Sequence, residues 1–106
     1  VVREDDGLAM SSRNVRLSPD ERSQAVGLHA GLRAAREAFR AGERDPGALL
    51  GALREEVEAR PLLSLQYAEI VDPGSLDAVD PVRSGSVAAV AAHCGDVRLI
   101  DNAVLE

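Results

Sequence analysis

The pattern of hydrophobic and polar positions predicts a long amphipathic helix near the start of the chain. Hydrophobic residues recur there at helical spacings of three and four, and they are Ala25, Leu28, Leu32, Ala35 and Phe39. Ser18 can cap this helix, Pro19 suits its first position, and Glu21 completes a capping box. Gly42 favours the left-handed conformation that ends helices. The pattern therefore predicts one helix between Ser18 and Gly42.

A second helix is predicted after a short connection. Asp45 and Pro46 form another helix start, and the hydrophobic stripe behind them consists of Leu49, Leu50, Leu53 and Val57. The Arg60-Pro61 pair predicts its end, because the residue before a proline avoids helical geometry. Residues 19–61 thus form a helical part, and the short connection predicts that the two helices pack antiparallel.

The rest of the chain has the pattern of β-strands. Residues 65–71, 87–94 and 97–102 are rich in strand-forming side chains, and turn residues separate them. Gly95-Asp96 is a two-residue connection that suits a tight hairpin. Residues 65–106 are therefore expected to form a small sheet. The expected fold class is α+β, with two main antiparallel helices packed with a small three-stranded antiparallel β-sheet that ends in a hairpin.

Composition limits the size and type of this domain. With 106 residues, the chain is expected to form a single domain, residues 1–106. It is 45% hydrophobic, but its only aromatic residues are Phe39 and Tyr67, so the core must be aliphatic. Met10 is the only methionine, which excludes an ordinary translation start at the first residue. We therefore expect a piece of a longer protein.

Charge and reactive residues exclude several classes of function. The net charge is −6 and few aromatic residues can stack on bases, so nucleic acid is not an expected partner. All twelve basic residues are arginines, so any bound anion must be held by arginine. One cysteine and two widely spaced histidines predict neither a disulfide nor a metal site. Neither a membrane span nor a signal peptide is recognisable, and a cytoplasmic location is expected.

Residues 1–18 lack a helical period and are expected to form a loop. The densest polar cluster of this loop contains Met10, Ser11, Ser12, Arg13 and Asn14. An arginine offers a bidentate fork and two hydroxyls offer further hydrogen bonds, which together can bind a phosphate. The same residue types also occur in plain solvated loops. Because few large apolar side chains lie here, we expect Arg3 to Asn14 to be the most mobile internal part of the chain and Ser18 to Gly42 to be among the most ordered.

Several segments of the chain resemble one known family. Val2-Arg3 and residues 6–14, which read Asp-Gly-Leu-Ala-Met-Ser-Ser-Arg-Asn, closely resemble the segment that opens the C-terminal domain of pantoate-beta-alanine ligases (pantothenate synthetases). The resemblance continues in Leu17-Ser18 with Glu21-Arg22, in Tyr67 to Asp72, and in Gly95 with residues 98–102. It covers essentially all 106 residues and is most specific at residues 6–14 and 98–102.

The resemblance implies an ATP-lid domain of an ATP-dependent ligase. In that family, pantoate attacks the α-phosphate of ATP to form pantoyl adenylate, and beta-alanine then displaces AMP to give pantothenate. By position, Ser11, Ser12 and Arg13 are implied as catalytic residues. The implied ATP-binding residues are Val2, acting through its backbone, and Met10, Ser11, Ser12 and Arg13. Mg²⁺ is implied only as an ion carried by the ATP phosphates.

The same resemblance implies partners that residues 1–106 do not contain. They are an N-terminal nucleotide-binding domain, the substrates ATP, pantoate and beta-alanine, and a second subunit, because the parent enzyme is expected to be a homodimer. The isolated chain is therefore expected to be inactive. Arg16 departs from the family, which often has an aromatic residue at this position.

Other interpretations stay open at this stage. One alternative is that the chain is a non-enzymatic helix-and-hairpin interaction module. Cys94 fits a small buried thiol, and His29 fits a half-packed helix side chain. The acidic run of residues 4–6 fits backbone capping better than magnesium binding, and Asp101-Asn102 fits a turn held by side-chain hydrogen bonds. No role is assigned to Arg16, His93 or Cys94.

Overall fold

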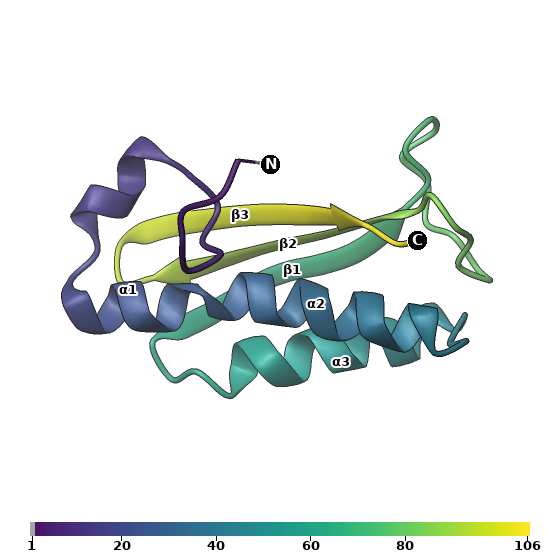
Figure 1. Cartoon of the computed structure of the whole chain (residues 1–106), viewed down its shortest axis with the longest axis horizontal. Helices are drawn as coiled ribbons and strands as arrows, with labels where there is room; N and C mark the ends of the chain where they lie inside the picture. Colours follow the sequence, from purple (N-terminus) through teal and green to yellow (C-terminus); the bar gives the residue numbers. More distant parts are fainter. Residues whose placement is uncertain (1) are drawn as a thin grey trace.

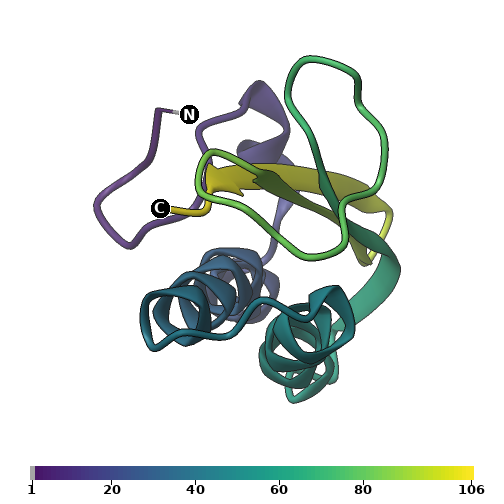
Figure 2. The same ribbon diagram turned by 90° about the vertical axis from the view of Figure 1, so that its right-hand side faces the viewer.

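A computed structural model describes residues 2–106 of the chain. Its elements in chain order are the 3-10 helix η1 (Ser12–Arg16), the helices α1 (Pro19–Ala25), α2 (Gly27–Arg40) and α3 (Pro46–Glu58), and the strands β1 (Leu63–Val71), β2 (Val87–Cys94) and β3 (Val97–Val104). The helices α2 and α3 form one layer and the strands form the other, while the N-terminal segment lies beside β3 (Figure 1, Figure 2). The predicted α+β fold is confirmed.

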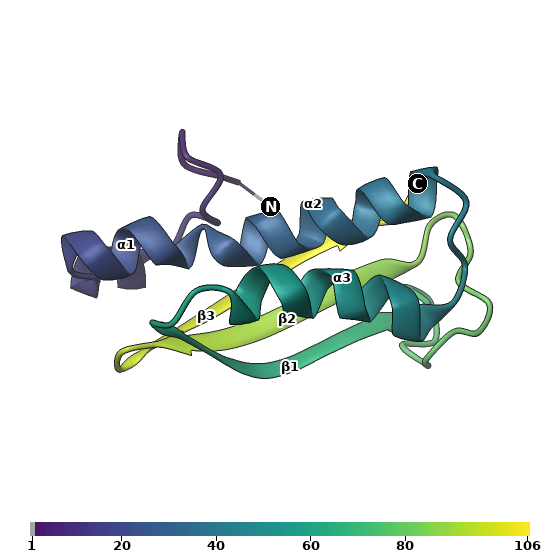
Figure 3. The same ribbon diagram turned by 90° about the horizontal axis from the view of Figure 1, so that it is seen from below.

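The predicted helix between Ser18 and Gly42 begins as expected but is interrupted. The capping box is confirmed, since the Glu21 N–H donates to Ser18 Oγ at 3.2 Å and the Ser18 N–H donates to Glu21 Oε1 at 2.9 Å. The helix breaks at Val26, although α1 and α2 run in nearly the same direction (Figure 3). Val26 and Gly27 both have lower helix propensity than alanine, which weakens the helix at this point. The prediction of one unbroken helix is therefore wrong.

The helices α2 and α3 bury the predicted hydrophobic stripes against each other and against the sheet. The buried members are Leu28, Leu32, Ala35 and Phe39 in α2 and Leu49, Leu53 and Val57 in α3. The α3 helix begins after Asp45, whose carboxylate accepts the Ala48 N–H at 3.0 Å. It lies against β1, while α2 lies against β2 and β3. Apart from Phe39, the buried residues of these two stripes are therefore aliphatic, as the composition predicts.

Replacing Gly31 with alanine should destabilise the chain, although alanine favours helices by about 1 kcal/mol over glycine. A Cβ at Gly31 would lie 2.9 Å from the Leu53 carbonyl oxygen and 3.2 Å from Val57 Cγ2, so α2 and α3 would have to move apart. Such overpacking costs about 1–3 kcal/mol. Gly51→Ala is the matched control, because a Cβ at Gly51 meets nothing within 4 Å. Urea unfolding should show a loss for Gly31→Ala and a gain for Gly51→Ala; a gain for both would contradict this packing.

The strands form an antiparallel sheet in the order β1-β2-β3. The bounds of β2 are as predicted, while β1 begins two residues earlier and β3 ends two residues later than predicted. Gly95 adopts a φ of +61° between β2 and β3, a conformation that glycine takes without strain. The predicted hairpin is therefore confirmed. The helices cover one face of this sheet (Figure 3).

Residues 2–18 contain more regular structure than the loop that the sequence predicts. Arg3 and Ala9 form a β-bridge that closes a short hairpin, and η1 follows this hairpin. Gly7 makes the turn with a φ of +94°. Leu8 belongs to the hydrophobic core and is only 3% exposed. The expectation of a plain loop is wrong, because a buried leucine, a β-bridge and a 3-10 helix give this segment a defined structure.

Candidate functional site

The predicted catalytic residues lie together on the exposed side of the N-terminal segment. Met10, Ser11, Ser12 and Arg13 are consecutive and exposed, and the last two are the first residues of η1. The Arg13 N–H donates to Ser11 Oγ at 3.2 Å, so Ser11 caps η1 and holds the backbone that carries Arg13. Among residues 2–106, no carboxylate lies within ion-pair distance of the Arg13 guanidinium. This arrangement leaves an arginine side chain available to an anion.

Val2, the remaining predicted ATP-binding residue, lies beside Met10. The Met10 N–H donates to the Val2 carbonyl oxygen at 2.7 Å across the hairpin. The Val2 side chain is exposed. The Val2 carbonyl oxygen is therefore engaged within the hairpin.

An ion pair anchors the hairpin to the sheet. The Arg3 guanidinium donates to both carboxylate oxygens of Asp101 in β3, at 2.6 and 3.0 Å, and to the Gly7 carbonyl oxygen at 3.0 Å. The side chain of Asp101 is 2% exposed and that of Arg3 is 24% exposed. A bidentate arginine–carboxylate pair is strong and directional, so it fixes the hairpin turn relative to β3.

The structure corrects the expectation for Asp101 and Asn102. The Asp101 side chain does accept the N–H of Asn102, at 2.8 Å, but both residues lie within β3 rather than in a turn. The main partner of Asp101 is Arg3, which is 98 residues away in the sequence. Local sequence gives no signal for so distant a pair.

A second network ties the hairpin to η1 and α1. The buried Asn14 donates through Nδ2 to Glu4 Oε2 at 2.6 Å and to the Ala9 carbonyl oxygen at 3.0 Å. Arg22 of α1 pairs with Glu4 at 3.3 Å and with Asp6 at 3.2 Å. These carboxylates are therefore engaged within the protein. Within residues 2–106, no group of three or more His, Cys, Asp and Glu side chains is placed to hold a metal ion.

His29 of α2 supports the hairpin turn. A Cβ at Gly7 would clash with the His29 ring, and the positive φ of Gly7 also disfavours any other residue. Burial, and next the neighbouring Arg3, lowers the pKa of His29. The lowered pKa favours the neutral ring, which packs against the turn, as expected for a half-packed side chain.

A small hollow of about 120 Å³ separates the predicted loop from β3. Met10, Ser11, Arg13 and Asn14 line one side of it, and residues 98–100 line the other. Residues 6–14 and 98–102 are the two segments that most specifically resemble the family, but the sequence gives no sign that they lie side by side. Residues 10–14 therefore lie beside β3, and β3 forms one wall of the hollow.

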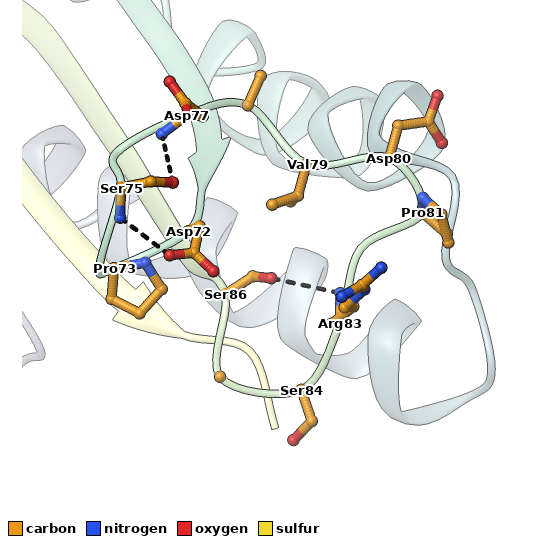
Figure 4. Close-up of a pocket in the computed structure, with 12 residues that line it drawn as sticks. Asp72, Pro73, Ser75, Asp77, Val79, Asp80, Pro81, Arg83, Ser84 and Ser86 are labelled. Atoms are coloured by element: carbon orange, nitrogen blue, oxygen red, sulfur yellow. Dashed lines mark hydrogen bonds between the residues drawn. The ribbon is translucent and has the colours of Figure 1, made fainter.

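A larger hollow lies at the other end of the sheet, in the segment that connects β1 to β2 (Figure 4). It measures about 460 Å³ and is lined by residues between Asp72 and Ser86. Asp72 accepts the N–H groups of Gly74 and Ser75 at 2.8 and 3.0 Å, and these bonds, that of Ser75 first, lower its pKa. Ser86 Oγ accepts the Arg83 N–H at 3.3 Å. Because these polar groups hold the loop itself, and aspartates outnumber the single arginine in the lining, the hollow is ill suited to a phosphate.

The residues without an assigned role have ordinary environments. Cys94 is buried, and burial raises the pKa of its thiol, which keeps the thiol protonated and unreactive. Arg16 forms an exposed ion pair with Asp96 at 3.6 Å. His93 is exposed on β2.

No helix in the described part of the chain is both long enough and apolar enough to cross a membrane.

Comparison with known proteins identifies the family. The sequence model described as "Pantoate-beta-alanine ligase" matches residues 1–104. The chain belongs to the pantoate-beta-alanine ligase family. The pantothenate synthetase of Roseiflexus castenholzii is 49% identical over 106 residues, which cover 100% of this chain and 38% of the relative. Pantothenate synthetase 1 of Bradyrhizobium diazoefficiens is 50% identical over 105 residues, covering 98% of this chain and 36% of the relative.

Solved structures of this ligase family share the fold. The crystal structure of pantothenate synthetase from Thermus thermophilus matches with a TM-score of 0.92 at 39% identity, covering 98% of this chain and 37% of that one. The predicted family is therefore confirmed. The chain spans between 36% and 38% of the length of these family members.

Proposed function

We propose that the chain is the C-terminal ATP-lid domain of a pantoate-beta-alanine ligase, in which Ser11, Ser12 and Arg13 act on the phosphates of ATP. The observation that carries this proposal is the exposed Ser-Ser-Arg run at the start of η1, directly after a hairpin that Arg3 anchors. Asn14 of η1 ties this run back to Glu4 of the hairpin. The anchors hold the backbone, while the Arg13 guanidinium pairs with no carboxylate among residues 2–106. In a chain of net charge −6, such a side chain suits an anionic substrate.

The proposed reaction has two steps. A carboxylate oxygen of pantoate attacks the α-phosphorus of ATP, and the bond from that phosphorus to the pyrophosphate oxygen breaks. The amine of beta-alanine then attacks the acyl carbon of pantoyl adenylate, AMP leaves, and the nitrogen loses a proton. Arg13 and the hydroxyls of Ser11 and Ser12 would stabilise the charge on the departing pyrophosphate. Met10 and the Val2 backbone would contact the nucleotide.

The proposal assigns the rest of the active site to other parts of the parent enzyme. An N-terminal nucleotide-binding domain would bind pantoate, beta-alanine and most of ATP, in a homodimer located in the cytoplasm. Mg²⁺ would be bound through the ATP phosphates, because Glu4 and Asp6 are already engaged with Arg22. The residues of this chain would then complete the site by closing over the phosphates.

The isolated chain should not catalyse ligation, because it lacks the residues expected to bind pantoate. The measurement is pyrophosphate release from ATP and pantoate, with the full-length parent enzyme as the positive control. We expect pantoate-dependent release, and pantothenate after beta-alanine is added, from the parent alone. Turnover by the isolated chain would show that the active site is misplaced, and an inactive parent would refute the ligase itself.

A further inference from the structure

A small hollow between α2, the edge strand β3 and the N-terminal hairpin is lined by three arginines and a histidine. It measures about 70 Å³, and its lining residues are Arg3, His29, Leu32, Arg33, Arg36 and Ala103. The hairpin, the end of β3 and α2 border the same side of the molecule (Figure 2). His29, Arg33 and Arg36 follow one another at spacings of four and three, so they lie on one stripe of α2. This hollow shares no lining residue with the hollow beside Met10 and Arg13.

Two buried polar atoms of this lining have no hydrogen-bond partner within residues 2–106. They are Nε of Arg36 and Nδ1 of His29. The edge of the His29 ring that carries Cδ2 and Nε2 faces Gly7, so Nδ1 lies on the opposite edge of the ring. A buried donor on a charged group is costly to leave without an acceptor. An acceptor placed inside the hollow would remove this cost.

The lining of the hollow is rich in positive charge. Among residues 2–106, those that line it include three arginines and no carboxylate, unlike the acidic hollow between β1 and β2. Arg33 and Arg36 pair with Glu37 and Glu106 at 3.8 and 3.7 Å, which is longer than a hydrogen bond. The side chains of Glu37 and Glu106 are 70% and 60% exposed, so solvent weakens both pairs. These carboxylates leave the arginines able to bind another anion.

The environment of His29 is consistent with this positive charge. Burial lowers the pKa of the ring most, and the neighbouring Arg3 lowers it next. Asp101 raises the pKa, but by less than Arg3 lowers it, and Arg33 lowers it further. The nearby charges together therefore disfavour a cation at this position. An anion would be attracted to the same place.

We propose that this hollow binds a phosphate group, which Nε of Arg36 and Nδ1 of His29 contact as donors. The planar fork of a guanidinium group matches two oxygens of a tetrahedral oxyanion, and Nε is one prong of that fork. Inorganic phosphate and the phosphate of a nucleotide share this chemistry. The small volume favours the free ion, because pockets that enclose whole small molecules measure about 300–1,000 Å³. Bound phosphate would join α2 to the hairpin before the Ser-Ser-Arg run, at a site separate from the one proposed for ATP.

The test follows the His29 ring by NMR in the full-length parent enzyme, with isotope-labelled histidine and His29→Gln to assign the signal. Inorganic phosphate and AMP are titrated separately at constant ionic strength. We expect phosphate to raise the pKa of His29 by about 1, because a nearby negative charge stabilises the protonated ring. Arg36→Gln should raise the half-saturating phosphate concentration at least about tenfold, the effect of losing a hydrogen bond to a charged group. The matched control is Arg54→Gln, which removes an exposed arginine of α3 and should leave the titration unchanged.

A second substitution separates a shaped site from general attraction between charges. Arg36→Lys keeps the positive charge and removes the fork, so it should also weaken phosphate binding. Equal binding by the native and Arg36→Lys enzymes would show that charge alone attracts the ion, and the proposal would be overturned. This variant also serves if Arg36→Gln fails to fold.

The remaining outcomes also decide the proposal. A His29 signal that ignores phosphate, or that responds equally in Arg36→Gln, would overturn it and leave water as the occupant. A response that is lost in Arg13→Ala and kept in Arg36→Gln would assign the effect to the ATP site, which also overturns it. A response lost in Arg36→Gln alone supports the proposal, and its strength with phosphate or AMP identifies the source. Because the measurement requires no turnover, an inactive enzyme with this response would refute the ligase and leave the phosphate site in place.

Discussion

Replacing Asp101 with asparagine should lower the free energy of unfolding of the chain by about 3 kcal/mol, at the lower end of the range for a broken buried ion pair. Asp101 is 2% exposed and accepts two hydrogen bonds from Arg3, at 2.6 and 3.0 Å. Asparagine keeps the shape of the side chain but removes the charge and turns one acceptor into a donor. The Arg3 guanidinium then stays largely buried without a counter-charge. Urea unfolding at neutral pH measures the change.

Asp96→Asn is the matched control for this substitution. Asp96 also pairs with an arginine, but its side chain is 91% exposed and the distance to Arg16 is 3.6 Å. Exposed pairs contribute about 0–1 kcal/mol, so this variant should unfold nearly as the native chain does. Equal losses in the two variants would contradict the anchoring role of Asp101. Replacing both Arg3 and Asp101 with apolar residues should cost less than Asp101→Asn alone, since no buried charge then remains.

Arg13→Ala in the parent enzyme should lower the rate of pantoate adenylation by about 10²-fold or more, the usual cost of removing one donor to a developing anion. The affinity for ATP should fall far less, because the contact strengthens as charge moves onto the departing pyrophosphate. Arg13 is exposed and has no carboxylate partner among residues 2–106, so its removal should leave the fold intact. Single-turnover measurement of pantoyl adenylate separates the rate from binding.

Arg16→Ala provides the comparison within the same short helix. Arg16 lies in η1 like Arg13, but it pairs with Asp96. Its removal changes the charge of the segment by the same amount and should lower adenylation much less. An unchanged adenylation rate for Arg13→Ala, or equal losses for both variants, would mean that residues 10–13 do not hold the phosphates.

The elements that the sequence predicts well are those with local signals. Ser18 and Glu21 specify a helix start within four residues, and Gly95 specifies the turn between two strands. Hydrophobic spacing placed the buried stripes of both long helices correctly. The break at Val26 was missed, because the stripe continues across it and only the neighbouring Gly27 hints at weakness.

The sequence suggested which residues form the candidate site, but it did not predict the contacts that hold them in place. The Ser-Ser-Arg run stands out locally, whereas the anchors Arg3 with Asp101 and Asn14 with Glu4 depend on tertiary geometry. Arginine and aspartate are common residues, and nothing in their immediate neighbours marks these two as partners. The order of the hairpin was also underestimated. The small number of apolar residues in this segment predicted a loop, but this number does not show that Leu8 reaches the core.

The pairing of Arg3 with Asp101 also sets an order of events during synthesis. A ribosome that adds about 5–20 residues per second makes Arg3 roughly 5–20 s before its partner. Throughout that interval the emerging chain can form its helices from local contacts, but the hairpin has no β3 to hold it. Residues 2–14 are therefore translated before the helices and strands of this domain and are among the last of its segments to be assembled. The geometry of the hairpin depends on β3, so a nascent chain cannot anchor this hairpin through Arg3 and Asp101 before the last strand of the sheet has been added.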